Sequence, residues 1–267
     1  MCLLRYEGLP STTPIAEGNT IFDEEAISEF YDRDLITDVI GQLKAGKEAQ
    51  VFVCRAHPKT GYDLLAAKLY RPREQRGFRS EAPYLEGRGS LRCGRARDSS
   101  VTRAIDRRSR AGKTLLSETW VRREYDVLHR LKREGVQVPA PVACTEHAVL
   151  MQYLGDEHAP APRLLAQSLT AGEAAAFRAA LLEDVERCLR AGLIHGDLSP
   201  YNVLVFQGAP WIIDLPQAVD AAVHPDGRSL LRRDVTNLTR HFARHGIPDD
   251  GADYADALWE QYERGRI

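Results

Sequence analysis

The stretch from Leu193 to Asp214, L-I-H-G-D-L-S-P-Y-N-V-L-V-F-Q-G-A-P-W-I-I-D, decides how the rest of the chain is interpreted. It holds two short apolar runs, Val203 to Phe206 and Trp211 to Ile213, separated by Gln207, Gly208, Ala209 and Pro210. Short apolar runs on either side of a glycine-containing loop predict a β-hairpin. The strands of this hairpin should therefore meet across a turn near Gly208.

Three oxygen-bearing side chains lie around the predicted hairpin. A turn near Gly208 places Asn202 opposite Asp214 at the open end, and Asp197 precedes Asn202 by five residues. Carboxylate and amide oxygens suit Mg²⁺, which proteins commonly share with substrate phosphates. Phosphoryl transfer needs a loop Asp that accepts the proton of the substrate hydroxyl, an Asn that holds one metal ion, and an Asp that holds the metals bridging the phosphates. We therefore predict that Asp197 and Asp214 are catalytic and that Asn202 and Asp214 bind metal.

Two other interpretations of this stretch have less support. His195-Gly196-Asp197 could be an ordinary turn with solvated side chains, but His-x-Asp, a downstream Asn at the kinase offset and an Asp closing an apolar strand together match one mechanism. A metal-dependent hydrolase built on His195 and Asp197 would need another ligand, and no second His or carboxylate stands at ligand spacing nearby.

Composition excludes several broad classes of protein. With 267 residues, 43% of them hydrophobic, the chain can form one large domain or two lobes with a proper core. A net charge of -2 gives no global attraction to nucleic acid or membrane. The five cysteines contain no C-x-x-C pair, which argues against a disulfide framework or a zinc site. No apolar run is long enough to span a membrane and no export signal opens the chain, so we expect a soluble cytoplasmic protein.

Alternating apolar patterns before residue 160 predict a small antiparallel sheet. The expected strands are 35–43, 49–56, 62–70, 142–144 and 149–154. In the third strand, the face that carries Lys68 also carries Leu64, Ala66 and Tyr70, because side chains alternate along a strand. A lysine on an apolar face needs a partner unless it lies at an edge and reaches solvent.

A helix from about Lys113 to Glu134 supplies that partner. Glu124 falls four residues after Trp120 and four before Leu128, which both belong to the apolar stripe of the helix. A buried carboxylate is costly unless it is paired, so we predict that Glu124 pairs with Lys68 and that Lys68 binds the nucleotide phosphates. The alternative is that Glu124 pairs near the surface with Arg123 or His129.

The nucleotide-binding segments are predicted from the same region. Residues 41–47 have the spacing of a P-loop, but Glu48 stands where Ser or Thr should bind magnesium, and a strand follows instead of a helix. We instead predict a strand-turn-strand cover in which Gly46 lets the backbone approach the phosphates and Lys47 supplies donors. In a kinase, the segment that contains Met151 and Tyr153 would be the hinge whose backbone contacts adenine.

The second half of the chain predicts a shortened helical lobe. Thr170 to Glu173 form a capping box that opens a helix ending before Gly192, and further helices are expected at about 228–244 and 253–264. There is no D-F-G after the hairpin and no A-P-E downstream. We therefore expect an α+β, bilobal, protein-kinase-like fold whose C-lobe lacks an activation segment. The expected division is a lead-in segment at 1–34, an N-lobe at 35–154 with an Arg-rich insertion at 71–112, and a C-lobe at 155–267.

That insertion separates charge strongly. From Arg71 to Arg110 there are twelve arginines against five acids, an excess of seven positive charges hidden by the near-neutral total. It is either a solvated loop or a basic flap that docks RNA or an acidic partner.

Taken together, these residues resemble the RIO atypical serine/threonine kinases, and among them the type without an N-terminal winged helix. The resemblance covers roughly residues 35 to 245. It rests on Gly46-Lys47-Glu48-Ala49, Ala67-Lys68-Leu69-Tyr70-Arg71-Pro72, Trp120 with Glu124, Pro160-Ala161-Pro162, His195-Gly196-Asp197-Leu198-Ser199 with Tyr201-Asn202, Ile213-Asp214 with Gln217, and Leu231-Arg232-Arg233-Asp234. Pro200, Leu215-Pro216 and the length of the insertion depart from the family pattern.

The resemblance implies a non-specific serine/threonine protein kinase, an ATPase, or both. It would use ATP with Mg²⁺, or Mn²⁺ in its place, and Asp214 could itself accept phosphate from ATP. Expected partners are ATP, a protein substrate or the chain itself, and a ribosome or RNA bound through the segment from Arg71 to Arg110, with no membrane and no DNA-binding domain. Two alternatives stay open at this point: a small-molecule kinase of the aminoglycoside or choline type, and a nucleotide-switched scaffold for RNA or the ribosome.

Overall fold

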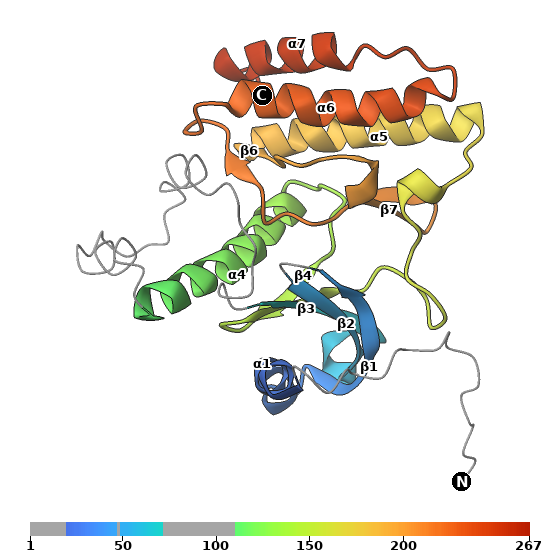
Figure 1. The fold of residues 1–267 in the computed structure, drawn as a ribbon. Helices are drawn as coiled ribbons and strands as arrows, with labels where there is room; N and C mark the ends of the chain where they lie inside the picture. Colours follow the sequence, from blue (N-terminus) through green and yellow to red (C-terminus); the bar gives the residue numbers. More distant parts are fainter. Residues whose placement is uncertain (1–19, 47–48, 72–109) are drawn as a thin grey trace. The chain divides into compact units, whose positions relative to one another are not determined.

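The computed structural model describes residues 20–46, 49–71 and 110–267 (Figure 1). The chain separates into two compact units, each considered by itself below. Among the described residues, the first unit comprises 20–46, 49–71, 110–125 and 140–161, and the second comprises 126–139 and 162–267. Lys47 and nearly all of the Arg-rich insertion lie outside the described residues. The predicted lobe boundaries stay a prediction.

The first unit contains the predicted antiparallel sheet, with strand order β1-β2-β3-β5-β4. Its strands are β1 (Ile36–Ala45), β2 (Ala49–Ala56), β3 (Leu64–Tyr70), β4 (Pro141–Cys144) and β5 (Ala148–Gln152). A short 3-10 helix, η1 (Pro58–Thr60), joins β2 to β3. Strand β3 lies between β2 and β5, so the lysine predicted to bind phosphates stands on the middle strand rather than at an edge.

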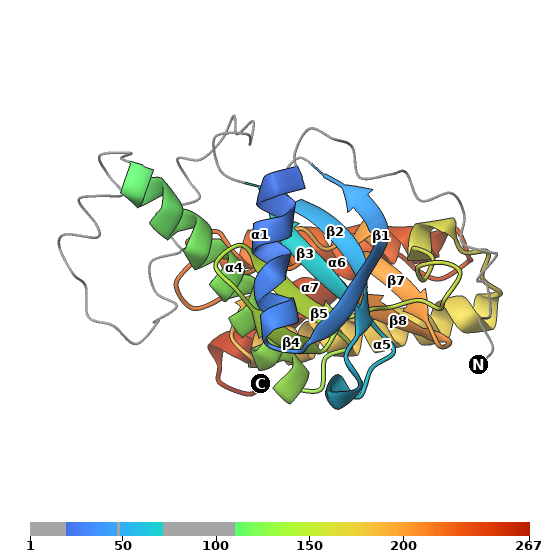
Figure 2. The ribbon, with the colours of Figure 1, turned by 90° about the horizontal axis from the view of Figure 1, so that it is seen from below.

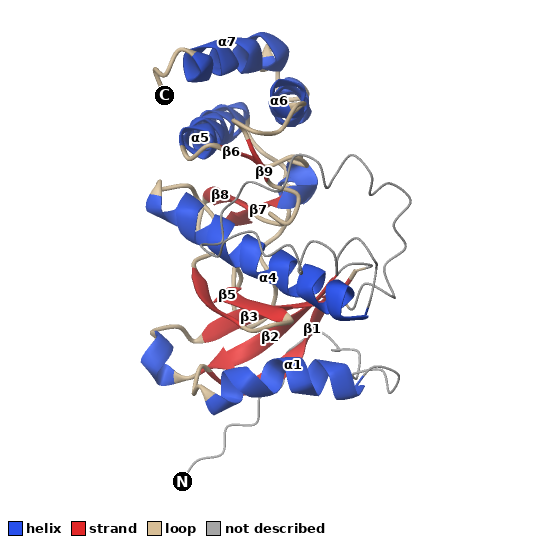
Figure 3. Ribbon diagram, turned by 90° about the vertical axis from the view of Figure 1, so that its left-hand side faces the viewer, coloured by secondary structure: helices blue, strands red, loops and turns tan. Residues whose placement is uncertain are grey.

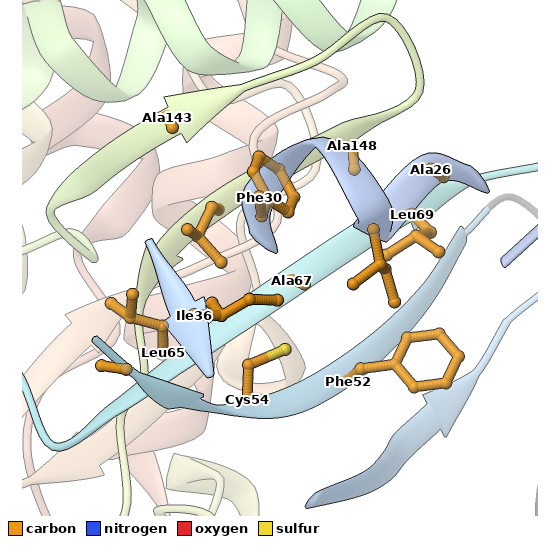
Figure 4. Packing of buried hydrophobic residues seen from close by; sticks show 13 residues of the cluster. Ala26, Phe30, Ile36, Phe52, Cys54, Leu65, Ala67, Leu69, Ala143 and Ala148 are labelled. Carbon is orange, nitrogen blue, oxygen red and sulfur yellow. The ribbon is translucent and has the colours of Figure 1, made fainter. Parts of the chain in front are cut away.

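Both faces of this sheet carry apolar residues. On one face, Phe52, Leu65 and Leu69 pack in a core cluster with side chains of helix α1 (Thr20–Asp32) (Figure 4). Figure 2 shows α1 lying along the sheet. Phe30 of α1 is fully buried there, so the helix near the start of the described chain contributes to the core of this unit. On the other face, Ala66 packs with Tyr153.

The second unit is mainly helical. Helices α5 (Ala171–Arg190), α6 (Gly227–Ala243) and α7 (Gly251–Glu263) group together (Figure 3). The predicted capping box is present, because Thr170 accepts from the backbone N–H of Glu173 and the Glu173 carboxylate accepts from the backbone N–H of Thr170. Two small ladders lie beside the helices, β6 (Leu193–Ile194) with β9 (Val219–Asp220), and β7 (Val203–Phe206) with β8 (Ala209–Ile212). The 3-10 helices are η3 (Leu164–Ala166) and η4 (Pro200–Asn202).

The hairpin is present, but its turn is shorter than predicted. Only Gln207 and Gly208 connect the strands, and their φ angles of 51° and 74° are both positive, as a type I′ turn requires. Pro210 therefore lies in β8, opposite Val205, and not in the loop. A two-stranded ladder leaves one side of each strand without a partner strand, and a proline fits there since it has no N–H to donate.

Helix α4 (Arg110–Arg133) runs through the region predicted to be helical, and its residues up to Tyr125 cluster with the first unit. Across the described residues, no helix combines the length and the hydropathy that crossing a bilayer would require.

Candidate active site

The predicted ion pair between Lys68 and Glu124 is present in the first unit. The Nζ of Lys68 donates to Oε1 of Glu124 at 2.7 Å. The two residues are only 9% and 2% exposed, so the pair is a buried contact and the surface alternatives for both residues are wrong. The strand supplies the lysine because alternation turns Lys68 toward α4, and the helix supplies the carboxylate because Glu124 sits on its inner stripe.

The sequence analysis missed a third member of this cluster. The hydroxyl of Tyr70, two residues after Lys68 on β3, donates to Oε2 of Glu124. Tyr70 is 1% exposed, whereas the alternation of the strand predicts it only as part of an apolar face. The alternation that places Lys68 beside Glu124 places Tyr70 there too, so the pattern contained the signal. Glu124 thus accepts through both carboxylate oxygens from one strand.

In the second unit, the loop after β6 brings Asp197 and Asn202 together. The side-chain amide of Asn202 donates to the backbone oxygen of Asp197 at 2.9 Å and to its Oδ2 at 3.3 Å. The backbone oxygen of Asn202 accepts from the N–H of Ile213 at 3.0 Å, which extends the hairpin ladder by one pair. Asp214 follows directly, so both residues lie at the open end of the hairpin as predicted. Asn202 is opposite Ile213 and not Asp214, however, because the two-residue turn shifts the register by one position.

Asp214 has an unusual backbone conformation. Its φ of 67° lies in the left-handed region, which Asp and Asn enter more readily than other non-glycine residues. Such residues persist only where their surroundings hold them, and they concentrate at functional sites. Leu215, at a position that departs from the family pattern, is 2% exposed and accepts from the N–H of Ala218 at 3.0 Å. The turn after Asp214 is therefore anchored by a buried side chain.

His195 has a structural place in this loop. Its Nδ1 accepts from the backbone N–H of Asp197 at 3.3 Å, so in the neutral ring the proton is on Nε2, which lies 3.1 Å from the oxygen of Ile213. His195 is 6% exposed. With both ring nitrogens engaged, it ties the loop to the end of the hairpin and is not a metal ligand. This geometry removes the metal-hydrolase alternative.

Asp234 is the second residue whose role the sequence analysis missed, although it belongs to a motif quoted for the resemblance. On α6, its carboxylate accepts from the N–H of Gly196 at 2.7 Å and from the N–H of Leu198 at 3.0 Å, on either side of Asp197. Burial raises the pKa of Asp234 to about 6, against the opposing effects of nearby His195 and of these two N–H donors. Asp234 follows Leu231 by three residues on the apolar stripe of the helix, the same signal that identified Glu124. It holds the backbone that carries Asp197.

The remaining predicted residues are placed only in part. The N–H of Gly46 donates to the oxygen of Ala49 at 2.9 Å, so a tight turn begins there, while Lys47 lies outside the described residues. Met151 and Tyr153 pack on one face of the sheet, and burial raises the pKa of Tyr153 to about 12, with the charge of Asp156 adding to the effect. Their contact with adenine stays a prediction.

The donor set at the end of the hairpin fits magnesium. The Asn202 amide nitrogen is engaged with Asp197, which turns the amide oxygen elsewhere, and Asp214 adds a carboxylate beside the same ladder. Within residues 20–46, 49–71 and 110–267, no three His, Cys, Asp or Glu side chains gather in a way that could hold a metal. Mg²⁺ often takes only one or two protein oxygens and completes its shell with phosphates and waters, so a set of only Asn202 and Asp214 is compatible with the predicted magnesium site, which stays a prediction.

Comparison with known proteins identifies relatives. The model of the RIO domain family matches residues 51–255. The RIO-type serine/threonine-protein kinase Rio1 of Haloferax volcanii is 33% identical over 247 residues, which cover 90% of this chain and 75% of that protein. The human serine/threonine-protein kinase RIO1 is 28% identical over 217 residues, covering 80% of this chain but 35% of the human protein.

A solved structure supports the fold. The Rio2 kinase of Chaetomium thermophilum, described as an ADP/Mg²⁺-phosphoaspartate complex, superposes with a TM-score of 0.60 at 24% identity. The match covers 89% of this chain and 70% of that one. At this identity the likeness establishes a common protein-kinase-like fold.

Proposed function

Because this chain belongs to the RIO family of serine/threonine kinases, we propose that it transfers the γ-phosphoryl group of ATP to a hydroxyl group or to water. Lys68, held in place by Glu124, acts on the nucleotide phosphates, Asp197 acts on the acceptor, and Asn202 and Asp214 hold Mg²⁺, with Mn²⁺ as an alternative. The observation that carries the proposal is the set of contacts that Asn202 makes at the open end of the hairpin. There, the amide of Asn202 donates to Asp197 while its backbone pairs with Ile213, next to Asp214.

The acceptor step follows from the position of Asp197. The acceptor oxygen bonds to the γ-phosphorus, the bond from that phosphorus to the bridging oxygen breaks, and ADP leaves. The carboxylate of Asp197 takes the proton of the acceptor hydroxyl. The bonds that Gly196 and Leu198 make with Asp234, together with the Asn202 contact, fix the Asp197 backbone, so its carboxylate needs little reorganisation. Bound Mg²⁺ supplies charge neutralisation of the phosphate oxygens.

Asp214 is the second candidate acceptor of the phosphoryl group. We propose that its carboxylate oxygen attacks the γ-phosphorus, that ADP leaves, and that water then cleaves the acyl phosphate to release inorganic phosphate. The Rio2 kinase of Chaetomium thermophilum is described with a phosphoaspartate. The left-handed backbone at Asp214 holds its carboxylate at the end of the hairpin, which suits a fixed nucleophile.

We propose a cytoplasmic protein whose acceptor is a protein or the chain itself. Its relatives are described as serine/threonine-protein kinases, which favours this over a small-molecule acceptor. The segment from Arg71 to Arg110, with its twelve arginines and five acids, is proposed to dock RNA or the ribosome. If it does, anisotropy of labelled structured RNA should show binding that weakens steeply as salt rises.

The experiment that tests the function is incubation with radiolabelled ATP, Mg²⁺ and cell extract. Label is resolved on the chain itself, on other proteins, on small molecules and as free phosphate. We expect label on protein, on the chain or in free phosphate. Label found solely on small molecules would instead indicate a metabolite kinase, and no transfer or hydrolysis at all would leave a nucleotide-binding scaffold.

A further inference from the structure

The hydroxyl of Tyr70 completes the buried cluster around Glu124. We propose that Tyr70 is a positioning residue. Its hydroxyl donates to Oε2 of Glu124, so Lys68 donates only to Oε1 of that carboxylate and keeps its orientation toward the nucleotide phosphates. This inference rests on the proposed function, since it assigns Tyr70 to the nucleotide-binding step of the same reaction.

Both contacts to the carboxylate come from one rigid strand. Lys68 and Tyr70 are two residues apart on β3 and so share a face. The strand is held on both sides, since Lys68 pairs with Val51 of β2 and Val149 of β5. At Tyr70, the backbone N–H donates to the oxygen of His147 at 2.9 Å, so the ring starts from a fixed backbone.

Because Glu124 is buried, leaving its Oε2 without a hydrogen-bond donor would be energetically unfavourable. Glu124 is 2% exposed and Tyr70 is 1% exposed, so bulk water does not reach the contact. A buried carboxylate oxygen without a donor costs its full desolvation penalty. Without the Tyr70 hydroxyl, Lys68 can replace the lost donor to Oε2 by reorienting its side chain and donating to both oxygens, since its ammonium carries three hydrogens.

Such a reorientation of the Lys68 side chain would weaken phosphate binding. An ammonium drawn onto both oxygens of Glu124 directs fewer of its hydrogens elsewhere, and its charge is neutralised more completely. The Lys68 ammonium also lies 5.3 Å from the centroid of the Tyr70 ring, so the ring limits where the ammonium can move. Tyr70 therefore sets how strongly Lys68 can act on a nucleotide without touching the nucleotide itself.

The test compares ATP with adenosine, because Lys68 is assigned to the phosphates alone. The variants are Tyr70→Phe, which removes only the hydroxyl, and Tyr70→Met, which fills buried space flexibly and also lacks it. Tyr125→Phe is the matched control: Tyr125 follows Glu124 on α4, and its hydroxyl donates to the oxygen of Val142 at 3.5 Å. Dissociation constants for Mg·ATP and for adenosine are measured by calorimetry on the full chain.

We expect either Tyr70 variant to bind Mg·ATP about tenfold more weakly while its affinity for adenosine stays within about twofold, as loss of one bond to a charged group predicts. The control should match the unmodified chain for both ligands. Equal weakening for ATP and adenosine, or no change for either, would overturn the role of Tyr70. If the unmodified chain binds adenosine and Mg·ATP equally or binds neither, the proposed function itself fails.

Discussion

Asp234 accepts a hydrogen bond of 2.7 Å from the backbone N–H of Gly196, joining α6 to the loop that carries Asp197. The same carboxylate accepts from Leu198, the residue after Asp197. Asp197 is thus held between two residues whose N–H groups point to one buried side chain. The charge state of Asp234 should therefore influence both stability and catalysis.

The first prediction is a pH dependence of stability. Burial raises the pKa of Asp234 from 3.8 to about 6, so between these values the folded state binds more protons than the unfolded state. The contribution of this group to the free energy of unfolding therefore falls as pH rises through that window, by on the order of 3 kcal/mol, and is constant above it. Asp234→Asn should remove this part of the pH dependence of the free energy of unfolding. Urea unfolding from pH 4 to 7 measures it, and identical pH slopes for both proteins would contradict the assignment.

Catalysis should respond in the opposite direction. Above about pH 6 the ionised Asp234 carboxylate is the stronger acceptor for Gly196 and Leu198, so the loop is best ordered there. We expect kcat to fall as pH drops below about 6, and Asp234→Asn to have a low kcat across the range. A kcat for this variant that equals that of the unmodified chain at pH 7 would show that the loop does not depend on Asp234.

The second prediction separates the stabilising and catalytic roles of Lys68. Lys68→Met leaves the buried Glu124 carboxylate without its charged partner, so we expect a lower Tm together with loss of ATP turnover by about 100-fold or more. Adding Glu124→Gln removes the uncompensated charge and should recover much of the Tm but none of the turnover. Thermal unfolding and a coupled phosphate assay give the two values. Recovery of turnover in the double variant would remove Lys68 from catalysis.

The third prediction concerns Asp197. If this carboxylate receives the acceptor proton, Asp197→Ala should lower kcat by about 100-fold or more and change nucleotide affinity little. Asn202 should stay in place, because its stronger contact is to the backbone oxygen of Asp197, which the substitution retains. Titration with a fluorescent nucleotide decides the matter. A collapse of affinity would mean that Asp197 is a metal ligand.

Local periodicity was enough to predict the fold and much of the site. Alternation on β3 and the helical stripe of α4 each placed one member of the Lys68 and Glu124 pair on a buried face, and two buried opposite charges must meet. The hairpin pattern correctly placed Asn202 and Asp214 at one end of the ladder, but the predicted register was wrong by one residue, since Asn202 lies opposite Ile213.

The missed features depend on contacts between residues far apart in the chain. The aromatic ring of Tyr70 places it in the apolar pattern of the strand, but its hydroxyl donates to Glu124, a residue 54 positions later in the chain. Asp234 bonds to Gly196, 38 positions earlier, and no local pattern names the partner of a buried acid. The turn at Gln207 was misjudged because proline usually marks loops, whereas a ladder of two strands tolerates it.

The central claim, that Asp214 holds the metal for phosphoryl transfer from ATP, is tested most directly by Mg²⁺-dependent ATP turnover in Asp214→Asn. Asn also adopts the left-handed conformation with φ of 67°, so this variant removes a charge and a nucleophile while keeping the backbone. We predict turnover reduced by about 100-fold or more, with an unchanged Tm and no acid-stable or acyl phosphate on the chain. Turnover equal to that of the unmodified chain, in a correctly folded variant, would contradict the account.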